Sequence, residues 1–306
     1  MPRYSVAVCS YNMAETVRPS LRSMLEQVGD DFEFVVVDGG STDGTVERLR
    51  ELEAEDDRVR VVALDPDPDR RLGADRQRSI EECDGEYVLT QLDVDDVYEP
   101  VVEDFVSIYH DLEAGVDREF LLSGTGINMA PKSLYLELPY RNLASSEDRD
   151  LWRRLFAADA MLWLEHAQIR EQIGYEKSLS DRLRRDWSGK VADAQVGIDF
   201  LSCLRWSVSH PRYYILEERR GPLGRVAKSL YDLVTYPLAY YAARELPRFE
   251  TPPGLERRGT LERLVAEARK SLSELEAEYE VSVDREALSA RGRQLFCLDE
   301  PPRADG

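Results

Sequence analysis

Lysine, cysteine and long apolar runs are scarce in this sequence. Only five of its 40 basic residues are lysines, and 60 acidic residues give it a formal net charge of −20. A surface this negative repels phosphate backbones, which disfavours a general nucleic-acid-binding function. Acidic, lysine-poor surfaces suit proteins that stay soluble in concentrated salt, where self-repulsion is screened. The composition therefore predicts a protein from a halophile, with an ordinary acidic cytosolic protein as the alternative.

The few cysteines form no metal-binding or disulfide pattern. They lie far apart and without CxxC spacing, at Cys9, Cys83, Cys203 and Cys297. This disfavours a zinc site and a disulfide framework, and it indicates a reducing compartment. The N-terminus has no basic region followed by a long apolar stretch, and no run reaches the roughly 18 apolar residues of a spanning helix. We therefore expect a cytoplasmic protein.

The first hundred residues alternate between apolar strands and helices. Strands are predicted over residues 4–9, 32–37, 59–63 and 86–91, and helices over 14–27, 45–53 and 73–82. Strands that are apolar throughout and separated by helices indicate a parallel sheet that is covered on both faces. In such sheets, ligands bind beyond the carboxyl ends of the strands.

The rest of the chain is predicted to be mainly helical. Residues 145–160 begin with a capping serine followed by acidic residues, which is typical of a helix start. Beyond about residue 170 the alternation fades, and residues 260–279 have the pattern of one charged amphipathic helix. We expect an α/β domain over residues 1–215 and a helical C-terminal extension over residues 216–306.

The segment QLDVDD, residues 91–96, places three carboxylates at the end of a predicted buried strand. Mg²⁺ and Mn²⁺ prefer few carboxylates together with phosphate oxygens and water. Asp93 and Asp95 therefore predict a metal ion that bridges to a diphosphate. The alternative is a solvated acidic turn, since DPDPD at residues 65–69 has the same spacing in a proline-rich loop.

A second cluster, VVVDGGSTDGT at residues 35–45, follows the second predicted strand. Asp38 ends the strand, Gly39 and Gly40 allow a tight turn, and the hydroxyl and carboxyl groups after them can cap the next helix. Taken alone, the segment is a well-capped strand–turn–helix.

Four segments, in order, resemble the signatures of family 2 glycosyltransferases, which have the GT-A fold. They are VAVCSYNMAE, VVVDGGSTDGT, RLGADRQRSIEECDGEYVLTQLDVDD and SSEDRDLWRRL. The resemblance covers roughly residues 4–156. It implies a GT-A catalytic domain, in which helices flank a mainly parallel sheet, followed by the helical extension.

The resemblance also implies roles for individual residues. Asp95 and Asp93 would hold Mg²⁺ or Mn²⁺, and Asp148, with Glu147 beside it, would act as the catalytic base. Asp38 would hydrogen-bond the nucleotide base, most often uracil, and Arg76 would help hold the loop that faces the diphosphate. The full set expected to bind the nucleotide sugar is Ser10, Tyr11, Asn12, Glu15, Asp38, Gly40, Arg76 and Asp93.

These roles imply a metal-dependent, inverting glycosyltransferase of the hexosyltransferase type. It would move a sugar from a nucleoside-diphosphate sugar, most often UDP-linked, to a hydroxyl or phosphate acceptor in glycan or polysaccharide assembly, including protein glycosylation. The acceptor attacks from the face opposite the leaving diphosphate, so the base and the metal must lie on opposite sides of the sugar.

Some positions depart from the family pattern. Gln77 stands where the family often has asparagine, and Asp75 adds negative charge near the expected phosphates. Residues 202–206, SCLRW, lack the glutamine of the QxxRW motif of processive members, which predicts a non-processive enzyme and a packing role for Arg205 and Trp206. His210 is the one histidine considered as a third metal ligand.

Two other functions are weighed against this one. A sugar nucleotidyltransferase needs a glycine-rich, basic loop after the first strand, whereas CSYNMAE is acidic and has no glycine. The other alternative is a non-catalytic relative that binds a nucleotide sugar or a protein as a scaffold. The intact set of aspartates, Asp38, Asp93, Asp95 and Asp148, disfavours it.

Residues 225–246 raise the question of a membrane. They combine aromatic and aliphatic residues with basic residues near both ends, as in helices that lie in a bilayer interface. A peripheral contact with the cytoplasmic face of a membrane would fit a lipid-linked acceptor. The alternative is a helical hairpin packed on the catalytic domain.

Overall fold

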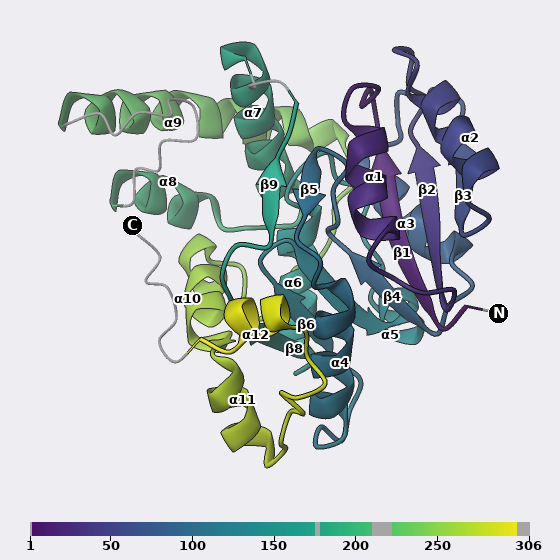
Figure 1. Cartoon of the computed structure of the whole chain (residues 1–306). Helices are drawn as coiled ribbons and strands as arrows, with labels where there is room; N and C mark the ends of the chain where they lie inside the picture. Colours follow the sequence, from purple (N-terminus) through teal and green to yellow (C-terminus); the bar gives the residue numbers. More distant parts are fainter. Residues whose placement is uncertain (1, 175–177, 210–221, 299–306) are drawn as a thin grey trace.

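The computed structural model describes residues 2–174, 178–209 and 222–298, and its centre is an eight-stranded sheet (Figure 1). The strand order is β10-β8-β6-β7-β4-β1-β2-β3. Four parallel strands form one half: β1 (Tyr4–Ser10), β2 (Phe32–Asp38), β3 (Val59–Ala63) and β4 (Tyr87–Thr90). Since β1 lies between β2 and β4, the strand order reverses beside it, which is where open α/β sheets bind ligands.

The other half of the sheet is mixed. β7 (Ile127–Pro131) runs antiparallel to both β4 and β6 (Leu121–Gly124), and β8 (Met161–Leu164) and β10 (Arg269–Lys270) continue in parallel. A separate ribbon pairs β5 (Asp96–Tyr98) with β9 (Arg170–Gln172). This ribbon brings the end of QLDVDD next to a segment some 75 positions later.

Alternate residues of the central strands enter two apolar layers. Val6 and Val8 pack on one face with α1 (Val17–Leu25), α2 (Thr45–Glu55) and α4 (Val102–Glu113). Ala7 and Val35 pack on the other with α3 (Leu72–Glu82), α5 (Lys132–Glu137) and α6 (Glu147–Ala157). Both faces are covered, as all-apolar strands require. The predicted fold class, a mainly parallel sheet flanked by helices and followed by further helices, is confirmed.

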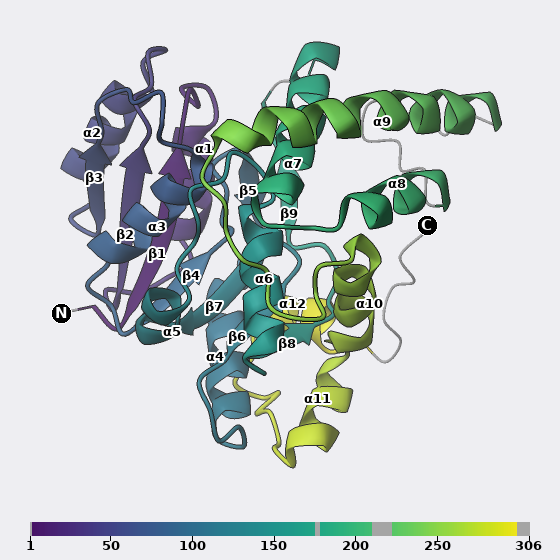
Figure 2. The same cartoon turned by 180° about the vertical axis from the view of Figure 1, so that it is seen from behind.

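Three later helices gather on the side away from β3 (Figure 2). They are α7 (Leu179–Gln195), α8 (Phe200–Ser209) and α9 (Pro222–Ala242), which leads into the short turn η1 (Ala243–Glu245). Side chains of α7, of α9 and of the segment around α8 form a small apolar core with Leu143. Of the helices that the structure describes, none has the length and apolar character needed to cross a membrane.

The single helix predicted over residues 260–279 is wrong. α10 (Arg258–Ala268) ends where β10 joins the edge of the sheet, and a new helix, α11 (Leu272–Tyr279), begins after Ser271. The Ser271 hydroxyl accepts the N–H of Glu274, whose carboxylate accepts the N–H of Ser271 at 2.7 Å. This capping box and the strand pairing override a helical pattern that was continuous in the sequence.

The end of the chain belongs to the main core. α11 and α12 (Ala290–Phe296) contribute Leu272, Leu275, Leu295 and Phe296 to the apolar layer on the α4 face. Asp104 of α4 also accepts the backbone N–H and the hydroxyl of Ser289, both at 2.7 Å. The boundary between residues 215 and 216 stays a prediction, but these later residues stabilise the sheet that precedes it.

Replacing Phe296 tests this packing. Its side chain is fully buried, so Phe296→Ala should lower the free energy of unfolding by about 3–5 kcal/mol, measured by urea denaturation. Leu136→Ala, at a half-exposed leucine of α5, is the matched control and should change it by less than about 0.5 kcal/mol. Equal effects of the two substitutions would contradict the packing of α12.

Candidate active site

The acidic segment is aimed outward by its own apolar residues. The chain leaves β4 through Gln91, whose φ of 63° turns the backbone sharply. Leu92 and Val94 are 2% and 3% exposed and pack in the core. Asp93 and Asp95 alternate with them and are partly exposed. The burial of two apolar side chains thus fixes the direction of the two carboxylates.

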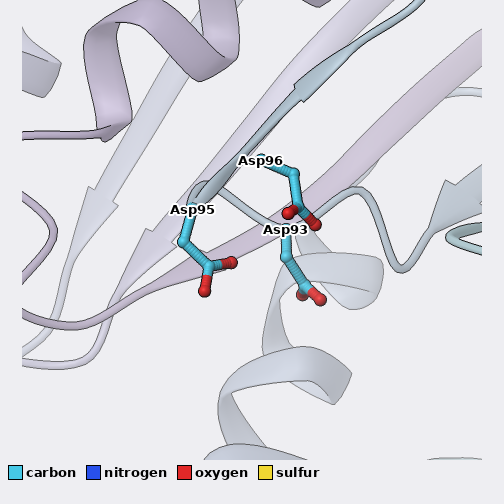
Figure 3. Close-up of side chains that lie close together, drawn as sticks. All are labelled: Asp93, Asp95 and Asp96. Carbon is cyan, nitrogen blue, oxygen red and sulfur yellow. The ribbon is translucent and has the colours of Figure 1, made fainter. Parts of the chain in front are cut away.

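Asp93, Asp95 and Asp96 present carboxylate oxygens within 4.8 Å of one another (Figure 3). They line a cavity of about 360 Å³ with Gln168, Arg170, Gln172 and Arg185. This volume lies within the range of small-molecule sites. The three carboxylates therefore form one wall of a pocket at the ligand-binding edge of the sheet.

The three carboxylates differ in their partners. Asp96 is buried and forms an ion pair with Arg170; burial raises the pKa of this carboxyl and Arg170 opposes the rise. Asp93 pairs with Arg76 at 3.1 Å and with Arg170 at 3.7 Å. Within the described ranges Asp95 has no ion pair and receives one long hydrogen bond, 3.4 Å, from Gln172. Asp95, with Asp93 beside it, has the carboxylate most available to a cation.

Arg76 joins this cluster to the start of α6. Its Nη2 lies 3.1 Å from Oδ1 of Asp93, and its Nε lies 3.0 Å from Oε1 of Glu147. Glu147 is 4% exposed. Burial and the neighbouring Asp148 raise the pKa of Glu147 to about 7, against the opposing effect of Arg76. The guanidinium therefore holds together two acidic motifs that lie more than fifty positions apart.

Asp148 has a more accessible carboxylate than Glu147. It is half-buried, and its side chain accepts the N–H of Arg149 at 2.7 Å. No ion pair involves Asp148 in the part of the chain that the structure describes. Two residues further, Asp150 is buried and pairs with Arg141 and Arg154, both at 3.0 Å. Arg141 thus ties α6 to the segment before it and Arg154 pairs within the helix, while the carboxylate of Asp148 is left available.

Asp38 shapes the turn after β2. It is fully buried, and each of its oxygens accepts two hydrogen bonds. The donors are the N–H groups of Gly40 and Ser41 and the hydroxyls of Ser10 and Ser41, at 2.6–3.1 Å. An ionised carboxylate has about four acceptor sites, so a contact with a nucleotide base requires one of these donors to leave. The base-binding role of Asp38 stays a prediction.

The turn itself depends on Gly40. Its φ is 93°, and a Cβ there would lie 3.0 Å from the backbone of Pro66. Across from it, Asn12 has a φ of 54°, donates its N–H to the Ser41 hydroxyl and accepts the N–H of Thr42. Tyr11 and Glu15 are exposed beside this junction. The loops after β1 and β2 are thus tied into one rim.

The structure also brings in residues that the sequence reasoning missed. Arg170 and Gln172 come from β9 and Arg185 from α7, yet all three line the cavity of the acidic cluster. No motif in the sequence marked them, because they reach the site only through the β5–β9 pairing and the position of α7.

The structure also bears on the predictions for Asp75, Arg205 and Trp206. The charge of Asp75 is offset by Arg70, whose Nε lies 2.8 Å away. Arg205 is exposed, so its predicted packing role is wrong, whereas Trp206 is partly buried against Gly259. His210, considered as a metal ligand, lies outside the described residues.

Comparisons with known proteins address the family. Residues 5–121 match the family described as glycosyl transferase family 2. Over 128 residues the chain is 31% identical to a Bacillus subtilis protein named as a teichuronic acid biosynthesis glycosyltransferase, TuaG. The N-terminal part of the chain, residues 5–121, is thus similar to that family. That match covers 42% of this chain and 48% of TuaG, so the chain spans about half of that relative's length. Of the four motifs described above, SSEDRDLWRRL lies beyond residues 5–121, which the family model matches.

Two solved structures match this chain at low sequence identity. Staphylococcus aureus TarS, residues 1–349, has 16% identity and a TM-score of 0.49, over 79% of this chain and 72% of TarS. Glucosyl-3-phosphoglycerate synthase from Mycobacterium tuberculosis, in complex with Mn²⁺, UDP and glucosyl-3-phosphoglycerate, has 19% identity and a TM-score of 0.48. That alignment covers 63% of this chain and 78% of the synthase.

The buried glutamate generates a pH-dependent prediction. Its pKa is about 7 in the fold against an ordinary value of 4.5, so between these values the folded state binds more protons at Glu147 than the unfolded state does. The stability that Glu147 contributes is therefore complete below about pH 4.5 and is lost as the pH rises through about 7. Glu147→Gln stays neutral, so its free energy of unfolding relative to wild type should rise across this window by on the order of 1–3 kcal/mol.

Urea denaturation of both proteins at about pH 5 and about pH 8 measures this difference. Glu137→Gln, at an exposed glutamate of α5, is the control and should show none of it. A difference that does not grow with pH for Glu147→Gln would contradict the burial of an ionisable group at this position.

Proposed function

We propose that this chain is a metal-dependent, inverting and non-processive glycosyltransferase of the hexosyltransferase type. Its donor would be a nucleoside-diphosphate sugar, UDP-linked in the first instance, and its acceptor a hydroxyl or phosphate group. One observation carries the proposal. Arg76 bridges Asp93 of the acidic cluster and Glu147 at the start of α6, so the expected metal site and the expected base share one site.

The donor set at the acidic cluster fits a hard divalent cation. Three carboxylates lie within ligand reach of one another, and Asp95 is free of ion pairs in the described segments. Few carboxylates, with phosphate and water completing the shell, are what Mg²⁺ and Mn²⁺ prefer. Asp95 and Asp93 would hold the ion, and Asp96, occupied by Arg170, would support the loop. When bound, the metal would offset charge on the leaving diphosphate.

Asp148 would take the acceptor proton. Its half-buried carboxylate has no competing ion pair among the residues described, so its oxygens are available to an acceptor hydroxyl. Glu147 would orient Arg76 rather than meet the acceptor, since it is buried and pairs with the guanidinium. The rim made by Ser10, Asn12 and Gly40, with the exposed Tyr11 and Glu15, would border the nucleotide.

The acceptor and the setting are also part of the proposal. A glycan or lipid-linked acceptor in glycan assembly, protein glycosylation included, fits the family match of residues 5–121. A cytoplasmic enzyme of a halophile fits the charge of −20 and the few lysines. A peripheral membrane contact through residues 225–246 would bring the enzyme to a lipid-linked acceptor.

Calorimetry with UDP tests the donor site. Wild-type protein in high salt should bind UDP at least tenfold more tightly with Mn²⁺ than without it, because the metal bridges carboxylates and diphosphate. Asp95→Ala should abolish this metal dependence while the protein stays folded. If folded wild type shows no metal-dependent binding of UDP, GDP or dTDP, the enzymatic proposal fails and the scaffold alternative gains.

Asp148→Asn separates catalysis from binding. The variant should bind UDP with Mn²⁺ within about twofold of wild type, yet sugar transfer should fall by roughly 10²–10⁴-fold because the general base is lost. Release of UDP from a panel of sugar donors measures the transfer. Unchanged turnover in the variant would exclude Asp148 as the base, and donor binding without turnover in wild type would favour the non-catalytic alternative.

Arg185 would bind the diphosphate of the donor. It is exposed, it lines the same cavity as the aspartates, and it has no ion pair or hydrogen bond with the described residues. A charge-assisted hydrogen bond contributes about 1.5–3 kcal/mol, so Arg185→Gln should weaken Mn²⁺-dependent UDP binding by roughly tenfold or more. Arg184→Gln is the matched control, because Arg184 is exposed on the same helix but does not line the cavity. Equal affinities for the two variants would remove Arg185 from the site.

A further inference from the structure

α9 exposes its apolar residues. Six of its large apolar side chains are between 43% and 68% exposed: Val226, Leu230, Leu233, Val234, Leu238 and Tyr241. Their spacing of three and four residues puts them on one face of the helix. On the neighbouring helix α8, Leu201 and Val208 are 66% and 58% exposed. α8 and α9 lie side by side in both views (Figure 1, Figure 2), so the two helices form an exposed apolar hairpin.

The opposite face of α9 buries charges. Lys228 and Asp232 point toward α7, where they meet Asp186 and Lys190. Lys190 lies 2.8 Å from Asp232 and 2.5 Å from Asp186, and the four side chains are at most 11% exposed. Two of the five lysines of the chain are thus enclosed in this cluster. Burying ion pairs while exposing leucine and valine is the reverse of what water favours.

The hairpin also departs from the acidic surface of the rest of the protein. Among residues 200–209 and 222–242 the only acidic residue is Asp232, which is buried, although 60 of the 306 residues of the chain are acidic. The exposed charges at its edge include two arginines, Arg205 on α8 and Arg244 just after α9, which stacks on the ring of Tyr241 at 5.2 Å. The exposed Asp199 and Glu245 lie just outside the two helices. Arginine and tyrosine beside an apolar face match the phosphate level of a lipid surface.

We propose that the α8–α9 hairpin is a lipid-binding face, on which Val226, Leu230, Val234 and Leu238 enter the acyl boundary and Arg205 and Arg244 meet lipid phosphates. A lipid surface explains both the buried ion pairs and the exposed leucine and valine side chains, since polar groups turn inward where the surroundings are apolar. A second copy of the chain would bring another arginine-bearing face against this one, with no exposed acidic residue on α8 or α9 to pair with the arginines. The inference extends the membrane contact proposed for residues 225–246. It adds α8 to that contact and names the side chains that would meet the lipid.

α7 connects the exposed apolar face to the cavity of the acidic cluster. Lys190 ties α9 to α7, and α7 carries Arg185 into the cavity of the acidic cluster. A lipid-linked acceptor held at the hairpin would therefore lie next to the helix that bounds this cavity. This consequence rests on the proposed function, whereas lipid binding itself can be measured without sugar transfer.

Flotation with phosphatidylcholine vesicles tests the proposal. It is done in high potassium chloride, because the charge of −20 would otherwise repel lipid phosphates. Wild-type protein should float with the vesicles. The double variant Leu230→Glu, Val234→Glu should lose at least tenfold in apparent partitioning, since two exposed apolar side chains become charged. Leu136→Glu, at an exposed leucine of α5, is the matched control and should float like wild type.

Circular dichroism melting confirms that the variants fold, and calorimetry with UDP and Mn²⁺ reports separately on the donor site. Wild type that stays off the vesicles, or a double variant that floats as well as wild type, overturns the proposal whatever the UDP result. If light scattering finds a wild-type dimer that the double variant abolishes, and no flotation occurs, the face is a contact between copies instead. Flotation without metal-dependent binding of UDP, GDP or dTDP would support the lipid face and reject the proposed function.

Discussion

The candidate site depends on one guanidinium. Arg76 is largely buried and pairs with Asp93 on one side and Glu147 on the other. Without it, two partly desolvated carboxylates would repel each other across the junction of β4 and α6, and the burial of Glu147 would have no compensating charge. α3 supplies this arginine from the carboxyl edge of the sheet, so the packing of a helix on β1 and β2 determines how two acidic motifs face each other.

Apolar packing determines where the remaining polar groups of the site point. Leu92 and Val94 anchor the acidic loop, and the β5–β9 ribbon delivers Arg170 to Asp96. Of the three aspartates in this cluster, Asp95 is the one that has no ion pair with the described residues. The arrangement pairs Asp96, which supports the loop, with Arg170, and it leaves the carboxylate of Asp95, with Asp93 beside it, most available to a cation.

Two surfaces of this protein differ in the kind of side chain that they expose. The part that contains the sheet carries most of its acidic residues outward, as a protein in concentrated salt does. The α8–α9 hairpin keeps its lysines and aspartates inside and turns leucine and valine outward. α7 contacts both parts, with Lys190 in the buried charge cluster and Arg185 in the cavity. An acceptor carried by a lipid and a donor held by the acidic cluster would meet at this helix.

The sequence by itself determined the alternation of strands and helices up to β4, because all-apolar strands and capped helices are local patterns. It also marked Asp38, Asp93, Asp95 and Asp148, which lie in short motifs at strand and helix ends. Only the tertiary structure decided that Arg170, Gln172 and Arg185 join the cavity, since they arrive through strand pairing and helix docking over long sequence separations. It likewise divided residues 260–279, where a sheet edge competed with a continuous helical period. The apolar and charged faces of α9 are both periodic in the sequence, and which of them turns inward depends on Asp186 and Lys190 of α7, so no local pattern could decide it.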